Sequence, residues 1–395
     1  MKNMIENQTS RIKSIDIIRG FIMIIMALDH VRDLMHTNSI SQSPTDLTTT
    51  TPELFFTRWI THLCAPIFVF LAGTSAYISL KRNNDVIAAK NHLLKRGLWL
   101  ILLEFTIVNL GMFFDLGFHL ILFEVIAVIG VGFIFLGLFL KLPSRYLGYI
   151  GLAIILLHNL FPLIPFGEKS TLHAVLNPLF NTTAIPLFEG KVFVLGYPPI
   201  PWLGIMLVGF ACGHFFELAP DKRNKIFVQL GVAVIGLFVS IRFINVYGDA
   251  SQWTSQKTGL FTFLSFINVT KYPPSLLFCL VTLGLLFLLL AYAEKLSAAV
   301  QEILSVYGKA PLFYFVIHFY LIHVITVAML FMQGFEWSSI NFSTGTFGRP
   351  VGVASGLPLW AIYIVWIGVV VALYKPCQWF GNYKATHKHW WLRYI

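Results

Sequence analysis

Apolar residues in this chain are gathered into runs of about 17 to 25 residues, the length that an α-helix needs to cross the hydrocarbon core of a bilayer. Short segments rich in Pro, Gly, Asn, Lys and Arg separate the runs. This pattern predicts an all-α, polytopic membrane helix bundle with about ten transmembrane helices, forming one domain over residues 1–395. The predicted spans lie near residues 12–35, 58–80, 96–112, 119–140, 145–162, 201–217, 226–245, 275–293, 310–332 and 357–374.

The composition agrees with this class of protein. Of the 395 residues, 57% are hydrophobic and only 12% are charged, which excludes an ordinary soluble domain. The formal net charge is +10, and such an excess is expected because Lys and Arg retain loops in the cytoplasm. The basic residues are scattered over short loops and form no aromatic and basic groove, so we predict no nucleic-acid partner.

Loop charges predict the orientation of the bundle. Most Lys and Arg residues, Lys2 among them, fall on alternate, mostly short segments, whereas the long loops 36–57, 163–200, 246–274 and 334–356 hold few, such as Lys169. Ten spans with this alternation place both termini in the cytoplasm. The polar segment MKNMIENQTS is followed by no small-residue cleavage site, so the first apolar run is predicted to be an uncleaved anchor.

The first span is unusual because it carries ionisable residues on or close to an apolar core. Such groups are costly at membrane depth and by default mark a functional site facing the bundle interior or a water-filled cavity. Arg19 and His30 are eleven positions apart, so they are nearly eclipsed on a helix and roughly 16 Å apart along its axis. The ionisable residues of this span are Asp16, Arg19, Asp29, His30, Arg32 and Asp33.

The outer end of the first span offers the residues of a general-base site. His30 lies near the outer edge of the hydrocarbon, and His36 follows at the end of the span. Either imidazole can accept a proton, and Asp29 or Asp33 can orient it. The alternative is structural: an interfacial histidine satisfied by water, on a helix with snorkelling ends and one ion pair.

Other spans add candidates to both ends of the bundle. Arg58 and His62 share a face at the outer end of the second span, and Tyr314 and His318 share a face of the ninth. His92, Lys95 and Arg96 form a candidate inner phosphate-binding patch, which anionic lipid headgroups would explain at least as well. His318 and His323 are about 140° apart on a helix, and no other spacing indicates a metal site.

Four segments carry a resemblance to a known family. SIDIIRGFIMIIMALDH, THLCAPIFVFLAGTSAY, YPPSLLFCLVTLG and YGKAPLFYFVIHFYLIH occur in this order between Arg11 and about His323. They resemble the bacterial branch of the heparan-α-glucosaminide N-acetyltransferase-like family of transmembrane acyltransferases. The R-G pair with a histidine eleven positions after the Arg is also similar to membrane O-acyltransferases that modify envelope sugars. The animal glucosaminide enzymes have an asparagine there and a catalytic histidine further on, for which His36 is the nearest counterpart.

This resemblance implies transfer of an acetyl group from cytoplasmic acetyl-CoA to the amine or hydroxyl of an extracytoplasmic sugar. It also implies a multi-pass protein of the bacterial inner membrane, with no metal, and leaves open a homodimer. The histidine would act as general base or as acyl carrier, and either His30 or His36 would be the principal one. The predicted catalytic residues are His30, His36, Asp29, Asp33 and His62. The predicted cofactor-binding residues are Asp16, Arg19, Arg58, Lys95, Arg96, Tyr314 and His318.

Two other functions use the same residues. A transporter or flippase of an envelope precursor would employ the buried charges as proton or substrate relays, without covalent chemistry. An acyltransferase with a lipid or protein acceptor is the third option. The consumption of acetyl-CoA separates transport from acyl transfer, and the acceptor has to be identified by experiment.

Overall fold

The apolar runs form long helices in the computed structural model, which describes residues 11–166 and 170–394. Lys2, Lys169 and the segment MKNMIENQTS, which the sequence analysis used, lie outside these residues. Within the described chain, eight helices are long and apolar enough to cross a membrane. The helices are α2 (Lys13–Met35), α3 (Pro52–Thr61), α4 (Cys64–Asn83), α5 (Val86–Leu103), α6 (Asn109–Phe113), α7 (Val125–Phe139), α8 (Ser144–Leu157), α9 (Thr171–Phe180), α10 (Pro199–Cys212), α11 (Pro220–Ile244), α12 (Gly259–Ile267), α13 (Leu276–Tyr292), α14 (Ala298–Lys309), α15 (Pro311–Met332) and α16 (Leu359–Thr386).

The predicted polytopic helix bundle is confirmed, and each of the ten predicted spans coincides with a helix. Eight of them belong to the long apolar helices, α2 is charged, and α7 has 15 residues. The third predicted span, 96–112, in fact begins at Val86, so its basic cluster lies inside a helix and not in a loop. Charged side chains in the early turns of a helix shorten its apolar run without ending the helix.

The fourth predicted span, 119–140, is wrong in its first residues. It opens with strand β1 (Leu120–Phe123), and the helix begins only at Val125. The strand belongs to a small sheet with β2 (Thr183–Pro186) and β3 (Val192–Leu195), in the order β1-β3-β2. β1 is parallel to β3, and β2 is antiparallel to it. A short, uninterrupted apolar run has no period that distinguishes a strand from a buried helix.

Helix α2 lies at the centre of the bundle and packs against α3, α4, α13, α14, α15 and α16. Its closest neighbour is α14, an amphipathic helix that lies outside the ten predicted spans. The two helices approach so closely that a Cβ atom on Gly20 would overlap the carbonyl oxygen of Leu304, and one on Gly308 would overlap that of Asp16. Glycine is required at both crossings because the backbones touch there.

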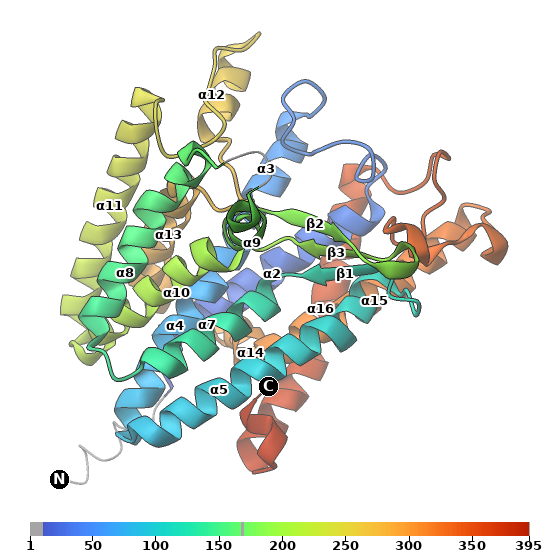
Figure 1. The fold of residues 1–395 in the computed structure, drawn as a ribbon. Coiled ribbons are helices and arrows are strands. Elements are labelled where there is room, and N and C mark those ends of the chain that lie inside the picture. Colours follow the sequence, from blue (N-terminus) through green and yellow to red (C-terminus); the bar gives the residue numbers. More distant parts are fainter. Residues whose placement is uncertain (1–10, 167–169, 395) are drawn as a thin grey trace.

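Both described ends of the chain lie at the same end of the bundle, because Arg11 and Lys384 line one cavity (Figure 1). The loops after α2 and α15, together with α12, lie away from those ends. Arg349 fastens two of these loops together, with Nη1 donating to the carbonyl oxygen of His36 at 2.8 Å and to Oγ of Ser39 at 2.9 Å. That the shared end is the cytoplasmic one stays a prediction from the charge bias.

Candidate active site

A cavity of about 650 Å³ opens at the end of the bundle where the described chain begins and ends. We call it the basic cavity, because five cationic side chains and a histidine line it, and its described lining includes no carboxylate. Residues from α2, α4, α5, α7, α14, α15 and α16 contribute to its wall. The basic residues are Arg11, Arg19, His92, Arg96, Lys309 and Lys384.

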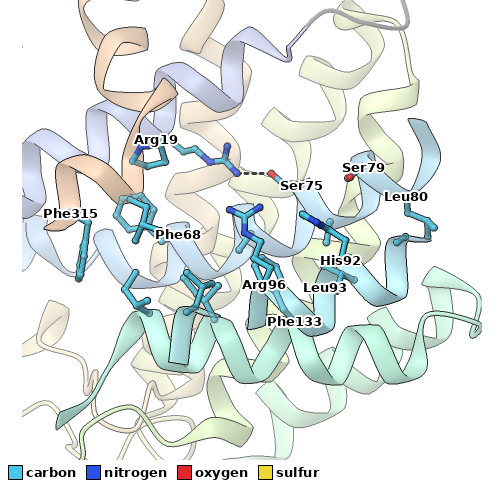
Figure 2. A pocket seen from close by; sticks show the side chains of 18 of the residues that line it. Arg19, Phe68, Ser75, Ser79, Leu80, His92, Leu93, Arg96, Phe133 and Phe315 are labelled. Carbon is cyan, nitrogen blue, oxygen red and sulfur yellow. Dashed lines mark hydrogen bonds between the residues drawn. The ribbon is translucent and has the colours of Figure 1, made fainter. Parts of the chain in front are cut away.

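Arg19 and Arg96 reach into the basic cavity from opposite walls (Figure 2). Arg19 comes from α2 and donates from Nη2 to Oγ of Ser75 at 2.6 Å. Arg96 comes from α5 and lies over the ring of Phe133, with 5.4 Å between the guanidinium carbon and the ring centroid. Its Nε is buried and has no hydrogen-bond partner among the described residues. A buried polar atom without a hydrogen-bond partner is costly, so Nε of Arg96 favours an anionic ligand.

The residues that line the basic cavity differ in part from the predicted cofactor-binding residues. Lys95 is exposed and does not line the cavity, because it is turned about 100° from Arg96 on α5. Asp16 does not line it either, since its carboxylate pairs with the guanidinium of Arg11 at 3.0 Å. Tyr394, from the other end of the chain, stacks on His92 with 5.6 Å between ring centroids.

The inner part of the basic cavity is apolar and leads toward two histidines. Its walls there include Met23, Phe68, Val125 and Phe315. The ring of Phe315 lies 5.7 Å from that of His318, centroid to centroid. A ligand whose anionic end lies among the arginines would therefore extend its apolar end toward this histidine pair.

His30 and His318 form a direct hydrogen bond between α2 and α15. Nδ1 of His30 lies 2.6 Å from Nε2 of His318, and Nδ1 of His318 lies 3.0 Å from the carbonyl oxygen of Tyr314. His318 is completely buried, and His30 stacks on Phe319 with 4.3 Å between centroids. His30 thus faces the bundle interior, as an active-site residue should, although neither histidine lines the basic cavity itself.

The acidic residues near His30 bind arginines and not the imidazole. Asp29 pairs through one oxygen with Arg32 at 2.7 Å and through the other with Arg58 at 2.5 Å. Asp33 pairs with Arg32 at 2.8 Å. The expectation that Asp29 or Asp33 orients His30 is therefore wrong, because consecutive residues point in different directions on a helix and Asp29 faces α3. The partner is His318, which the sequence analysis had placed with the cofactor.

Two further predicted histidines lie close to this cluster but outside the pair. His62 occupies the break between α3 and α4, 5.6 Å from the ring of Phe278, and its Nδ1 has no partner within the described chain. His36 caps α2 and is half-buried. Burial, together with the nearby Arg32 and Arg349, lowers the pKa of His36 below its ordinary value. Of the predicted bases, only His30 shares a hydrogen bond with another titratable side chain.

Three residues near the histidine pair are not among the predicted site residues: Lys271, Tyr272 and Tyr197. Lys271 is 7% exposed, and its ammonium lies 5.0 Å from the ring centroid of Tyr272 and 5.9 Å from that of Tyr197. It interacts electrostatically with Asp29 and His30. These residues come from loops distant in sequence, and only the YPP turn of residues 272–274 marks one of the loops as special.

A comparison with known families decides the class of protein. Residues 11–237 match the family model described as heparan-α-glucosaminide N-acetyltransferase, catalytic, which is more than half of the chain. The chain belongs to this family. A comparison with curated proteins found no match. Membership in the heparan-α-glucosaminide N-acetyltransferase family makes the protein a membrane-embedded acyltransferase, as the sequence resemblance indicated.

The family match covers only part of the site. Arg19, His30 and Arg96 lie within the matched residues, whereas His318, Lys309 and Lys384 follow them. The helices that complete the basic cavity and the histidine pair are thus α14, α15 and α16. Residues 11–166 and 170–394 contain no group of three or more His, Cys, Asp or Glu side chains that could hold a metal ion.

Proposed function

We propose that this protein transfers the acetyl group of acetyl-CoA to a sugar amine or hydroxyl on the opposite side of the membrane. The observation that carries the proposal is the basic cavity, whose described lining holds five cations and no carboxylate and whose apolar inner end approaches His30 and His318. The guanidinium of Arg96, whose Nε has no hydrogen-bond partner among the described residues, favours a phosphate-bearing ligand. CoA carries phosphates at one end and the reactive thioester at the other.

The long axis of the site suits a donor that enters from the cytoplasm. Phosphates would lie among Arg11, Arg19 and Arg96, and the pantetheine arm would follow the apolar wall past Met23 and Phe315. Met23 precedes His30 by seven residues, which is about 10 Å along α2. The thioester would therefore reach the level of His30 while the nucleotide stays at the cytoplasmic end.

His30 is the proposed reacting histidine. As a general base it accepts the proton of the acceptor amine or hydroxyl while the acceptor attacks the thioester carbonyl carbon. As an acyl carrier it attacks that carbon itself. Both routes need an imidazole nitrogen with a free lone pair, and His30 has only one nitrogen bound to His318. Asp29 holds Arg58 and Arg32 and thus fixes the outer end of α2 against α3.

The experiment uses the full-length protein in vesicles. Labelled acetyl-CoA is supplied at the side of residues 11 and 384, and glucosamine or glucose is enclosed on the other side. We expect labelled sugar and free CoA thiol with the unaltered protein, and neither product with His30→Ala. His36→Ala serves as the comparison and should retain transfer, which would identify the principal base.

If the protein were a transporter, the same vesicles would give the opposite result. Sugar would cross the membrane without thiol release, and omission of acetyl-CoA would not matter. That result would overturn the proposal. Transfer to glucosamine but not to glucose would define N-acylation, and the reverse would define O-acylation.

A further inference from the structure

The hydrogen bonds of His318 determine where its hydrogen lies. Nδ1 of His318 is 3.0 Å from the carbonyl oxygen of Tyr314, one helical turn earlier on α15. A carbonyl oxygen can only accept, so Nδ1 must carry the hydrogen. Nε2 of the neutral ring is then a lone-pair acceptor, and it is this atom that faces His30.

The hydrogen on His30 follows from the same reasoning. Its Nδ1 lies 2.6 Å from the acceptor Nε2 of His318 and must therefore be the donor. The other nitrogen of His30, Nε2, is left with a free lone pair. We infer that His318 is a positioning residue that fixes the tautomer of His30 and makes Nε2 of His30 the reacting atom. This inference rests on the proposed function.

A histidine in this place does the work that a carboxylate does in other base-and-orienter pairs. Both carboxylate oxygens of Asp29 are already bonded to arginines. When Nε2 of His30 gains a proton, the ring becomes an imidazolium whose Nδ1–H donates to His318. The short bond between the two rings stabilises that cation, and no buried negative charge is needed beside it.

The packing around the pair keeps this geometry in place. His318 is completely buried and stacks on Tyr314, with 5.5 Å between centroids, and it lies 4.4 Å from the ring of Phe319. Phe319 also stacks on His30. Because aromatic rings hold both imidazoles, neither can rotate freely to exchange its two nitrogens. The tautomer is set before any substrate binds.

The transfer balances with these groups alone. The acceptor nitrogen or oxygen forms a bond to the thioester carbonyl carbon, and its proton passes to Nε2 of His30. The bond between carbon and sulfur breaks, and its electron pair leaves with the sulfur of CoA. The proton on Nε2 then passes to that thiolate. The products are the acetylated sugar, the CoA thiol and the neutral histidine pair.

Substitutions of His318 separate positioning from packing. In His318→Gln the amide oxygen can still accept from Nδ1 of His30, whereas His318→Phe keeps a ring but offers no acceptor. His323→Phe is the matched control on the same helix. His323 is also completely buried, its Nδ1 bonds the carbonyl oxygen of Gly111 at 3.0 Å, and its Nε2 has no partner in the described chain.

We expect kcat to fall about 100-fold in His318→Phe, the size of a general-base contribution, and to stay within about tenfold of wild type in His318→Gln. The KM for acetyl-CoA should be unchanged in both variants, and His323→Phe should leave kcat unchanged. Equal values of kcat for the Gln and Phe variants would overturn the inference. A rise in KM with constant kcat would overturn it as well.

Nitrogen NMR of ¹⁵N-histidine-labelled protein in lipid gives a readout that needs no substrate. The signals of His30 are identified by their loss in His30→Gln. We expect a protonated Nδ1 and an unprotonated Nε2 in the wild type, and a mixture of tautomers in His318→Phe. An unprotonated Nδ1 in the wild type would refute the tautomer assignment. If no acetyl transfer occurs with any sugar, the proposed function fails while this spectrum still decides the tautomer.

Discussion

The two ends of helix α2 handle charge in opposite ways. At the outer end, Asp29, Asp33, Arg32 and Arg58 form what we call the outer ion cluster, in which each carboxylate pairs with a guanidinium at 2.5 to 2.8 Å. At the other end, the basic cavity gathers arginines and lysines with no carboxylate in its described lining. The outer ion cluster thus neutralises its own charges, whereas the basic cavity concentrates positive charge beyond what the Arg11–Asp16 pair neutralises.

This difference separates scaffold from binding site. A buried ion pair contributes little net stability over an apolar pair, but removing one member leaves an uncompensated charge and is strongly destabilising. Cations gathered in one cavity repel one another in the ligand-free protein and are stabilised when an anion binds. Substitutions in the outer ion cluster should therefore affect folding first, and substitutions in the basic cavity should affect ligand affinity first.

The largest effect is expected for Arg58→Met. It leaves one oxygen of Asp29 buried without its cation, so the free energy of unfolding should fall by about 3–5 kcal/mol. Thermal or denaturant unfolding of the purified protein in detergent measures this change. The double variant Arg58→Met with Asp29→Leu should lose less than the sum of the single variants, because the unpaired carboxylate is gone. Unchanged stability with a weakened affinity for CoA would instead place Arg58 in the donor site, as the sequence analysis predicted.

Arg96→Met should weaken CoA binding about 10- to 100-fold, which corresponds to about 1.5–3 kcal/mol for a charge-assisted hydrogen bond. The melting temperature should not fall, because Arg96 has a buried Nε without a partner in the described chain. Calorimetric titration with CoA measures the affinity. Lys95→Met is the matched control, since this neighbouring cation is exposed and outside the cavity. Equal losses in both variants would show that only the general positive charge matters.

The sequence predicted the bundle and the importance of α2 because both follow from local pattern. Long apolar runs define helices in a membrane whatever their tertiary contacts, and Asp29 and His30 are conspicuous within such a run. Of the predicted inner patch, His92 and Arg96 line the basic cavity, whereas Lys95 does not, and phosphate binding there stays a prediction. Two residues adjacent in sequence diverged because a helix, and not a loop, carries them.

What the sequence could not predict is how different helices meet. The bond between His30 and His318 joins residues 288 positions apart, and no periodicity within either helix relates the two. Lys309 and Lys384 reach the basic cavity from α14 and α16 for the same reason. Closeness in the chain therefore favours Asp29 or Asp33 as the partner of His30, whereas in the tertiary structure both carboxylates pair with arginines.

The salt concentration should affect the two ends of α2 differently, and this effect should be smaller than those of the substitutions above. Raising the ionic strength from about 0.1 M to about 1 M shortens the Debye length from about 10 Å to about 3 Å, so the affinity of the open basic cavity for CoA should drop. In the outer ion cluster, Asp29, Arg32 and Arg58 are largely buried, so their pairs are screened much less than the partly exposed Asp33. We expect the apparent Kd for CoA to rise with salt while the melting temperature of the ligand-free protein changes little. If salt lowered the affinity for CoA and the melting temperature together, the outer ion cluster and the basic cavity would not differ in how their charges are neutralised.

The smallest effect concerns His36, just beyond the outer ion cluster. Burial, and then the nearby Arg32 and Arg349, lower the pKa of His36. Between this lowered pKa and the ordinary value of about 6.5, the unfolded chain binds more protons than the folded protein, so stability rises with pH there and is lost as the pH falls. His36→Gln should therefore narrow the difference in melting temperature between about pH 7.5 and about pH 5.5. An unchanged difference would mean that the imidazole is not confined by the two arginines. His36 would then be free to face solvent and to compete with His30 for the role of base.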